Sequence, residues 1–348
     1  MSQKFVYVHI GQHKTATTYI QKLLAENFDT LKKEFDLLYP KTGRKGRKGG
    51  HHDFSRSLLD RGEYYKGKEN FQIENLLQEI EANNAKNILI SSEDFEFLSL
   101  EKIKFLHQIL NEDFCVIPIL YLRNWLHGVF SYWQERIKGG STRPFHEFFD
   151  GPLQSIIQKQ KKVVENWSHF FGKQIQIVVY DNLKYERENP LIFLMKECLN
   201  IPISKNSNCL ELVLPYTINS SSSPEKVELI KQLNIDREKN FWKQININKS
   251  YGFFLKKAEN FKSNYTLSQL AGENAESLME LQDSVSCFIL NNFYERILNP
   301  YSYKQLFINQ HSLPNFEVLP NGFYKRYLDL QENYDRVHRW KTELQNFC

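Results

Sequence analysis

The stretch Phe5–Leu24 constrains the fold of this chain more than any other. Residues 5–10 are mostly aromatic or β-branched, which predicts a buried strand, and Gly11 permits a tight turn after it. The threonines within residues 15–18 supply hydroxyl groups where a helix should begin. The stretch therefore predicts a strand, a loop and a helix in direct succession.

The loop of this unit is predicted to bind an anion. A helix N-terminus leaves its first backbone N–H groups unpaired and carries a partial positive charge, which favours phosphate or sulfate. The residues expected to form this site are Gly11, Gln12, His13, Lys14, Thr15, Ala16, Thr17 and Thr18. The ATP-type loop reads G-x-x-x-x-G-K-[ST], whereas here the lysine comes early and Ala16 replaces the second glycine. A plain helix cap by the threonines is the alternative.

The rest of the N-terminal half alternates between apolar strands and amphipathic helices. Strands are predicted at residues 37–40, 87–92, 114–122 and 174–180, although Pro118 suggests a bulge or an edge position in the third of these. Helices are predicted at 19–33, 51–60, 71–84, 100–111, 125–137, 154–171 and 190–200. This alternation indicates an α/β fold with a parallel sheet, and ligands on such sheets bind at the carboxyl ends of the strands.

Two further polar positions follow predicted strands. Glu93 comes after the strand at 87–92, and Arg123 comes after the strand at 114–122. Together with the Gly11 loop they should converge on one crevice. Ser131 stands eight residues after Arg123, two helical turns on, and a guanidinium with a hydroxyl suits a phosphate monoester. A surface arginine at a helix start is the alternative.

These two motifs resemble those of the sulfotransferases that use 3′-phosphoadenosine 5′-phosphosulfate (PAPS). The loop is similar to their 5′-phosphosulfate loop, and Arg123 with Ser131 is similar to their 3′-phosphate signature, with Trp133 in place of the usual tyrosine. The resemblance covers roughly residues 4–235. It implies a P-loop NTPase-like three-layer fold, PAPS as donor, 3′-phosphoadenosine 5′-phosphate (PAP) as product, and no metal.

The resemblance also implies roles in catalysis. Lys14 would offset charge on the departing nucleotide, and the acceptor hydroxyl or amine would need a general base. Glu93 is the first candidate, because related enzymes place the base after the corresponding strand. His52 and His51 are the competing candidates, since histidine titrates in a useful range. The alternative is that residues 91–94 cap the helix that begins near Leu98.

Composition limits the other classes of function. The net charge is +4 and the pI is about 8.6, which suits an anionic donor and predicts no nucleic-acid role. Five widely spaced cysteines with no C-x-x-C pair predict a reducing compartment and no zinc site. No apolar run approaches the roughly 20 residues that span a bilayer, so a cytoplasmic protein is expected.

The predicted organisation is an α/β core over residues 1–235 and a mainly helical extension over 236–348. The extension would pack on the core, and it is a candidate for binding the acceptor, which is expected to be a glycan, a lipid-linked sugar or a small molecule. A P-loop kinase that uses ATP and Mg²⁺ is the alternative enzyme. A non-catalytic nucleotide-binding relative is the third possibility.

Overall fold

The computed structural model describes most of the N-terminal two thirds of the chain. The described residues are 3–44, 49–60, 67–110, 113–143, 152–185, 187–203, 274–298 and positions 227, 231, 234 and 235. The chain divides into two compact units that are interleaved in sequence. The first contains Met1–Asn124, Gln158–Ile218 and Asp283–Ile308, and the second contains Trp125–Ile157, Asn219–Gln282 and Asn309–Cys348. Most of the predicted extension, residues 236–273 and 299–348, lies outside the described residues, so the predicted boundary near residue 235 stays a prediction.

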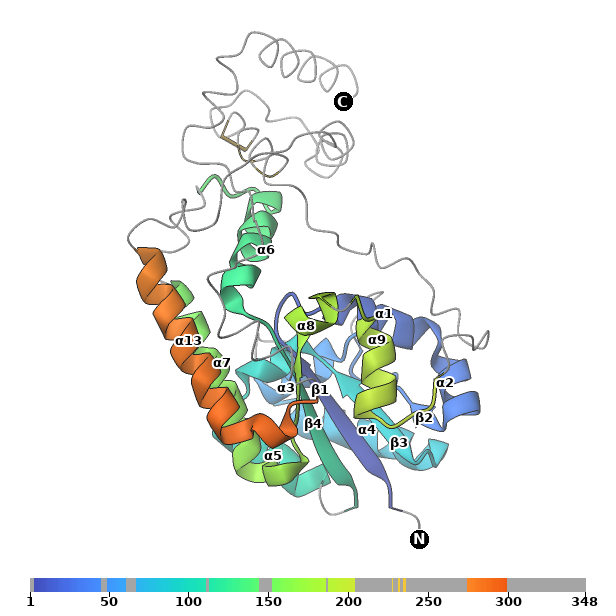
Figure 1. The fold of residues 1–348 in the computed structure, drawn as a ribbon. Helices are drawn as coiled ribbons and strands as arrows, with labels where there is room; N and C mark the ends of the chain where they lie inside the picture. The colour runs from blue at the N-terminus through green and yellow to red at the C-terminus, as the bar shows by residue number, and fades with distance from the viewer. Residues whose placement is uncertain are drawn as a thin grey trace, which may run out of the picture. The chain divides into compact units, whose positions relative to one another are not determined.

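The first unit is built on a five-stranded parallel sheet in the order β2-β3-β1-β4-β5 (Figure 1). Its strands are β1 (Phe5–Gly11), β2 (Leu37–Leu38), β3 (Asn87–Ser91), β4 (Cys115–Leu122) and β5 (Gln176–Val179). The predicted α/β class and parallel sheet are confirmed. Because β1 is central and the chain continues to β2 and β3 on one side and to β4 and β5 on the other, the strand order reverses there. A crevice at the carboxyl end of β1 is therefore the expected ligand site.

Pro118 occupies a position that the sequence pattern did not foresee. It pairs in unbroken register with Val8 of β1, and β4 is an interior strand. The pairing of β4 with β5 begins only at Ile119. Proline is tolerated here because the ladder on the β5 side starts after it, so neither the predicted bulge nor the predicted edge strand is needed.

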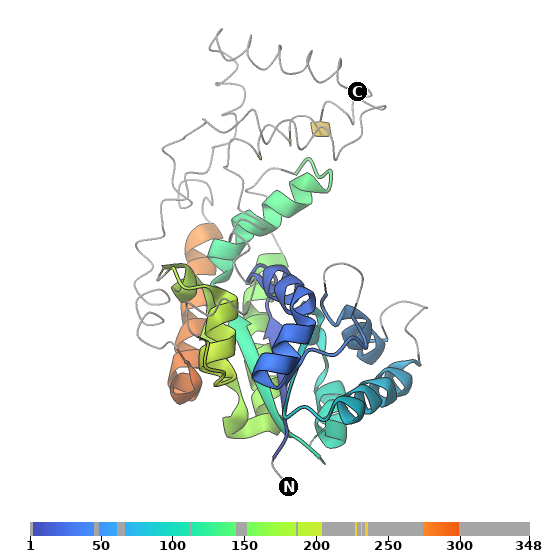
Figure 2. The same ribbon diagram turned by 90° about the vertical axis from the view of Figure 1, so that its right-hand side faces the viewer.

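Helices cover both faces of this sheet (Figures 1 and 2). One layer contains α1 (Thr17–Glu26), α2 (Phe28–Phe35), α8 (Tyr180–Tyr185) and α9 (Pro190–Phe193), which share a core with Tyr7 and Tyr121. The other layer contains α3 (His52–Leu58), α4 (Glu69–Asn83), α5 (Leu100–Leu110) and the part of α7 (Pro152–Phe171) that begins at Gln158. A 3₁₀ helix, η2 (Glu93–Phe97), follows β3 directly.

One predicted helix is divided in two. Residues 19–33 were expected to form a single helix, but α1 ends at Asn27, where φ is −103° and ψ is 21°. The side chain of Asn27 donates a hydrogen bond to the carbonyl oxygen of Leu23 at 2.9 Å. Asparagine competes in this way for the carbonyls at a helix end, which explains the break.

The described structure contains two further α-helices, and short helical segments at η4 (Gly172–Gln174), η5 (Leu194–Cys198) and η6 (Tyr294–Arg296). The end of α13 (Asn274–Phe293) leads to Ile297, which forms a parallel bridge with Ile177 of β5. In the second unit, α6 (Trp125–Lys138) confirms the helix predicted at 125–137. Asn234 donates to the carbonyl oxygens of Ile137 and Ser141 at 2.8 and 2.9 Å, which fixes the end of α6.

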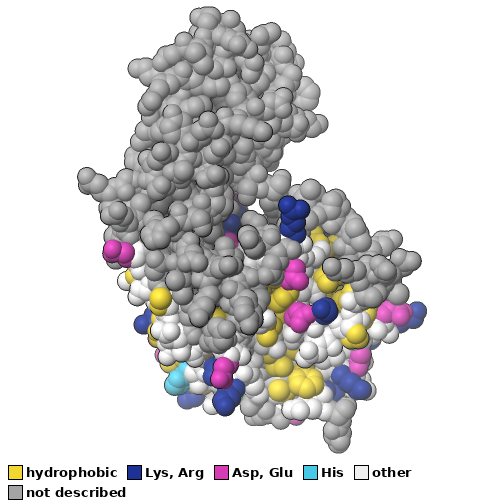
Figure 3. Space-filling model, viewed as in Figure 1, with side chains coloured by type: hydrophobic (Ala, Val, Ile, Leu, Met, Phe, Trp, Pro, Cys, Tyr) yellow, Lys and Arg dark blue, Asp and Glu magenta, His cyan; other side chains and the backbone are white. Residues whose placement is uncertain are grey.

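On the face drawn in Figure 3, basic and acidic side chains of the described residues are interspersed among hydrophobic ones. Within the described part of the chain, no helix is long and apolar enough to cross a membrane. The same residues contain no cluster of three or more histidine, cysteine or acidic side chains with the geometry of a metal site.

Candidate active site

The β1–α1 loop has a backbone shape that few residues adopt. Lys14 and Ala16 have positive φ angles of 72° and 61°, in the left-handed region that is costly for residues with a side chain. A Cβ at Gly11 would lie 2.0 Å from Cγ2 of Thr17, so only glycine fits. Strain and close approach of this kind concentrate at ligand-binding loops. The loop therefore has a preformed cradle in front of the N-terminus of α1, which fits an anionic group.

Several predicted anion-binding residues hold the loop together. Thr15 is buried, and its hydroxyl donates to the carbonyl oxygen of Gln12 at 2.6 Å. Gln12 is buried as well, and its Oε1 accepts from the backbone N–H of Arg123 at 2.9 Å and from Nε2 of Gln160 at 3.1 Å. His13 is exposed, whereas Lys14, Ala16 and Thr18 are partly exposed. The buried side chains of Gln12 and Thr15 thus shape the loop, whereas these four residues are at least partly accessible to solvent.

Arg123 lies against the loop from the β4 side and is 4% exposed. Its Nη1 donates to the carbonyl oxygen of Lys14 at 2.8 Å, and its Nε is 3.6 Å from Oδ1 of Asp181. Asp181 also accepts from the backbone N–H of Asn124 at 2.7 Å. Arg123 therefore supports the left-handed backbone at Lys14, and a buried carboxylate balances its charge.

Ser131, the second predicted 3′-phosphate contact, is partly buried on α6. That helix belongs to the second unit. Its contact with the donor stays a prediction.

The β3 side of the site begins at a capped 3₁₀ helix. The hydroxyl of Ser92 accepts a hydrogen bond from the backbone N–H of Asp94 at 3.2 Å and so caps η2. The helix that residues 91–94 would have capped is α5, which begins at Leu100, and there the hydroxyl of Ser99 accepts from the backbone N–H of Lys102 at 3.3 Å. The side chain of Glu93 is directed elsewhere.

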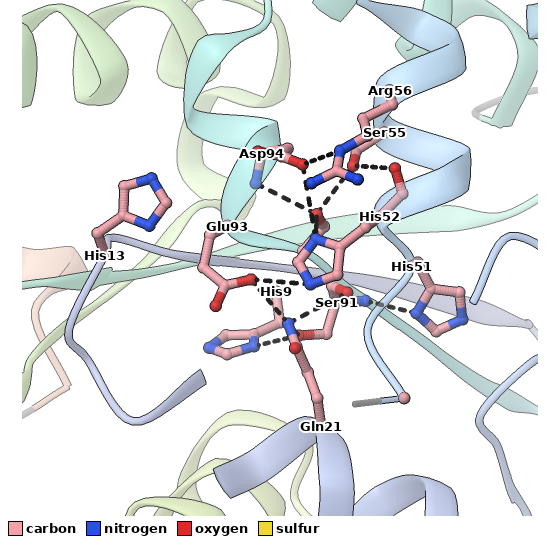
Figure 4. Close-up of polar contacts among 12 residues, drawn as sticks. His9, His13, Gln21, His51, His52, Ser55, Arg56, Ser91, Glu93 and Asp94 are labelled. Carbon is pink, nitrogen blue, oxygen red and sulfur yellow. Dashed lines mark hydrogen bonds and ion pairs between the residues drawn. The ribbon is translucent and has the colours of Figure 1, made fainter. Parts of the chain in front are cut away.

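The carboxylate of Glu93 is held through one of its two oxygens. Its Oε2 accepts from Nε2 of Gln21 at 3.2 Å and lies 3.3 Å from Nε2 of His52, and its side chain is 12% exposed. In Figure 4, Oε1 points away from His52. No residue in the described part of the chain bonds to Oε1. Glu93 therefore presents one oxygen beside the loop that ends β1.

His52 connects Glu93 to a second carboxylate. Its Nδ1 is 3.0 Å from the hydroxyl of Ser92 and 3.6 Å from Oδ2 of Asp94. Arg56, one helical turn further along α3, donates from Nε to the same oxygen of Asp94 at 3.0 Å (Figure 4). Burial acts to raise the pKa of Asp94, but the hydrogen bond from His52 and the charge of Arg56 outweigh it, so the net pKa lies below its ordinary value.

His51 has a different environment from His52. It is fully buried, its Nε2 donates to the carbonyl oxygen of Pro40 at 3.0 Å, and its Nδ1 accepts from the backbone N–H of Ser91 at 3.1 Å. Burial is the main cause that lowers its pKa to about 3, with a smaller contribution from the charge of Arg44. Both ring nitrogens bond to the backbone, so of the two predicted histidines His52 is the one that contacts Glu93.

His9 is a packed strand residue, as its place in β1 predicted. It is fully buried, its Nδ1 is 2.8 Å from the hydroxyl of Ser91, and burial lowers its pKa to about 4. The Ser91 hydroxyl also accepts from Nε2 of Gln21 at 3.2 Å. His9, Ser91 and Gln21 thus form a neutral layer beneath Glu93.

His13 contacts η2 on the opposite side from His52. Its Nε2 is 3.5 Å from Oε1 of Glu96, and Nζ of Lys159 is 3.8 Å from the same oxygen. Burial raises the pKa of Glu96, and the charges of Lys159 and His13 partly offset this. The contact joins the loop, η2 and α7.

The residues of the site that were not predicted as site residues include Gln21, Arg56, Asp94, Glu96 and Asp181. Gln21 stands one helical turn after Thr17, so its side of α1 could have been inferred from helical periodicity. Asp181 follows β5 as Glu93 follows β3, which was an available signal. Nothing local marks Arg56, because its partner is 38 residues away in the sequence.

No family model matches this chain, and no curated protein matches it either. Among solved structures, the chain is similar to a sulfotransferase domain from the curacin biosynthetic pathway. The two share 12% sequence identity with a TM-score of 0.37, over 80% of this chain and 97% of that one.

Proposed function

We propose that this chain is a sulfotransferase that moves a sulfuryl group from PAPS to a hydroxyl or amine of an acceptor. The observation that carries the proposal is the position of Glu93 relative to the β1–α1 loop. His9 and Ser91 pair in register on neighbouring parallel strands. The loop that follows β1 and the carboxylate of Glu93, which follows β3, therefore lie at the same edge of the sheet. The first would hold an anionic donor, and the second has an oxygen directed away from its own partners.

In this proposal each residue has a separate task. The cradle between Gly11 and Thr17 and the first N–H groups of α1 hold the 5′-phosphosulfate. Oε1 of Glu93 takes the proton from the acceptor, whose oxygen or nitrogen then forms a bond to sulfur. The bond from sulfur to the bridging oxygen breaks, and PAP leaves with its new charge offset by Lys14.

To bind the 3′-phosphate, the guanidinium of Arg123 would have to bond to it in addition to its present partners. Arg123 already bonds to the carbonyl of Lys14 and faces Asp181. We assign it two tasks: it supports the loop, and it supplies guanidinium N–H groups to the 3′-phosphate together with Ser131. The acceptor class proposed is a glycan, a lipid-linked sugar or a small molecule, bound with the help of residues 236–348, in a cytoplasmic protein.

A comparison of nucleotides tests this function. The melting temperature of the full chain should rise with PAP in the absence of Mg²⁺ and should not rise with ATP, because binding to the native state alone stabilises it. At 100 times the dissociation constant the expected stabilisation is about 2.7 kcal/mol. A rise with ATP and Mg²⁺ but not with PAP would overturn the proposal in favour of a kinase.

A further inference from the structure

The cluster on the far side of Glu93 suggests a role for residues that do not contact either substrate. It consists of His52 and Arg56 from α3 and Ser92 and Asp94 at the start of η2. Their side chains are largely buried: those of His52, Asp94 and Arg56 are 15%, 9% and 30% exposed. Such a cluster is costly to assemble unless its charges are paired.

The contacts in this cluster form a continuous series that leads from Arg56 to Glu93. Arg56 donates to Asp94 at 3.0 Å, Asp94 lies 3.6 Å from Nδ1 of His52, and Nε2 of His52 lies 3.3 Å from Oε2 of Glu93. A carboxylate at one ring nitrogen orients an imidazole so that its other nitrogen meets its partner in a fixed position. Other titratable groups face these residues: the charges of Glu93 and Asp94 act on Glu96. Glu93 also acts on His9 and Tyr39, and His52 acts on His51.

We propose that Asp94, held by Arg56, is a positioning residue that acts through His52 to fix the carboxylate of Glu93. Nε2–H of His52 and Nε2–H of Gln21 both donate to Oε2, which leaves Oε1 as the oxygen that takes the acceptor proton. His52 is then a support for the base and not the base itself. This inference rests on the proposed sulfuryl transfer.

The physical gain is a reduction in the freedom of Glu93. A glutamate side chain has several rotatable bonds, and ordering it in the transition state costs conformational entropy. Two donors from different helices, α1 and α3, restrict it before the acceptor arrives. Proton transfer depends on such placement within hydrogen-bond reach of the reacting group.

The test combines a kinetic and a spectroscopic measurement on the full chain. Asp94→Asn should lower kcat roughly tenfold or more with the KM for PAPS nearly unchanged, since the loss falls on the chemical step. Asp94→Glu should recover part of that loss. The acceptor is whichever member of a panel of phenols and monosaccharides the wild-type chain sulfates with labelled PAPS. Asp60→Asn is the matched control, since it makes the same change in the surface pair with Lys102.

Nitrogen-15 NMR of the histidine rings provides a readout that needs no activity. His52 resonances, assigned by their loss in His52→Gln, should move in Asp94→Asn and in Glu93→Gln but not in Asp60→Asn. Unmoved His52 resonances in Asp94→Asn, or an unchanged kcat in that variant, would overturn the inference. A wild-type chain that transfers no sulfate while its His52 resonances respond would instead contradict the proposed function.

Discussion

The strands on either side of β1 end in two polar clusters that use their charges differently. On the β4 side, Arg123 donates to the carbonyl oxygen of Lys14 and to the side chain of Gln12, both in the loop, and Asp181 balances the arginine. On the β3 side, Glu93 is held through one oxygen by Gln21 and His52, and the other oxygen is directed away from them. The first cluster shapes the loop, and the second presents a reactive group beside it.

The difference between the clusters predicts different consequences for their loss. Removing a group from the β3 side should affect the chemical step and leave nucleotide binding intact. Removal of Arg123 from the β4 side should affect the loop, the nucleotide and the stability of the fold together. Variants of the two sides can therefore separate the roles that the structure suggests.

The largest effect is expected for Glu93→Gln. Loss of the general base should lower the rate of sulfuryl transfer by roughly 10²–10⁴-fold, because glutamine cannot accept the proton. The thermal shift produced by PAP should stay the same. Glu101→Gln, an exposed carboxylate on α5, is the control and should keep full activity. Retained transfer in Glu93→Gln would move the base to His52 and remove the contrast between the two sides.

Arg123→Ala should affect stability as well as binding. It leaves the buried carboxylate of Asp181 without its partner, which should lower the free energy of unfolding by about 3 kcal/mol. Urea unfolding measures this loss. The double variant Arg123→Ala with Asp181→Asn should recover part of the stability but none of the PAP affinity. Full stability in the single variant would show that Arg123 does not support the loop.

A smaller and more gradual effect is expected from acid. His9 and His51 have pKa values lowered to about 4 and about 3 by burial, against 6.5 in the unfolded chain. Between pH 6.5 and 4 the unfolded state binds more protons than the native state, so stability falls as the pH falls. The loss from His9 alone should be on the order of 3 kcal/mol at pH 4.

Chemical unfolding at a series of pH values measures this slope. His9→Gln should flatten it over the window from pH 6.5 to 4, even if the variant is less stable at neutral pH. An equally steep slope in His9→Gln would show that protonation of His9 does not cause the loss of stability in acid. Asp94 acts in a different window, because its lowered pKa makes its contribution disappear only below its ordinary value near 3.8.

The sequence predicted the strands and the loop that position the site, because the patterns that indicate them lie within short segments of the chain. The run from Phe5 to Ile10 and Gly11 predicted β1 and the loop, and the apolar run ending at Ser91 put Glu93 after a strand. The partners of these residues depend on distant parts of the chain. The contact between Arg56 and Asp94, and the carbonyl of Lys14 as a partner of Arg123, follow from how α3 and β4 pack, which no local pattern encodes.

Two other features that the sequence did not predict are the division of α1 from α2 and the position of Pro118. The break at Asn27 depends on a side chain that bonds to Leu23, and the tolerance of Pro118 depends on where β5 begins. Hydrophobic periodicity reports neither feature. Prediction from the sequence was therefore reliable for the strands and the parallel sheet, and poor for the contacts that give each polar residue its role.

Titration calorimetry with PAP and with adenosine 5′-monophosphate, without Mg²⁺, tests the central claim most directly. The two ligands differ only in the 3′-phosphate, which is the group assigned to Arg123 and Ser131. The account predicts that PAP binds the wild-type chain at least about tenfold more tightly, since a charge-assisted hydrogen bond contributes roughly 1.5–3 kcal/mol. Equal affinities for the two nucleotides would contradict it.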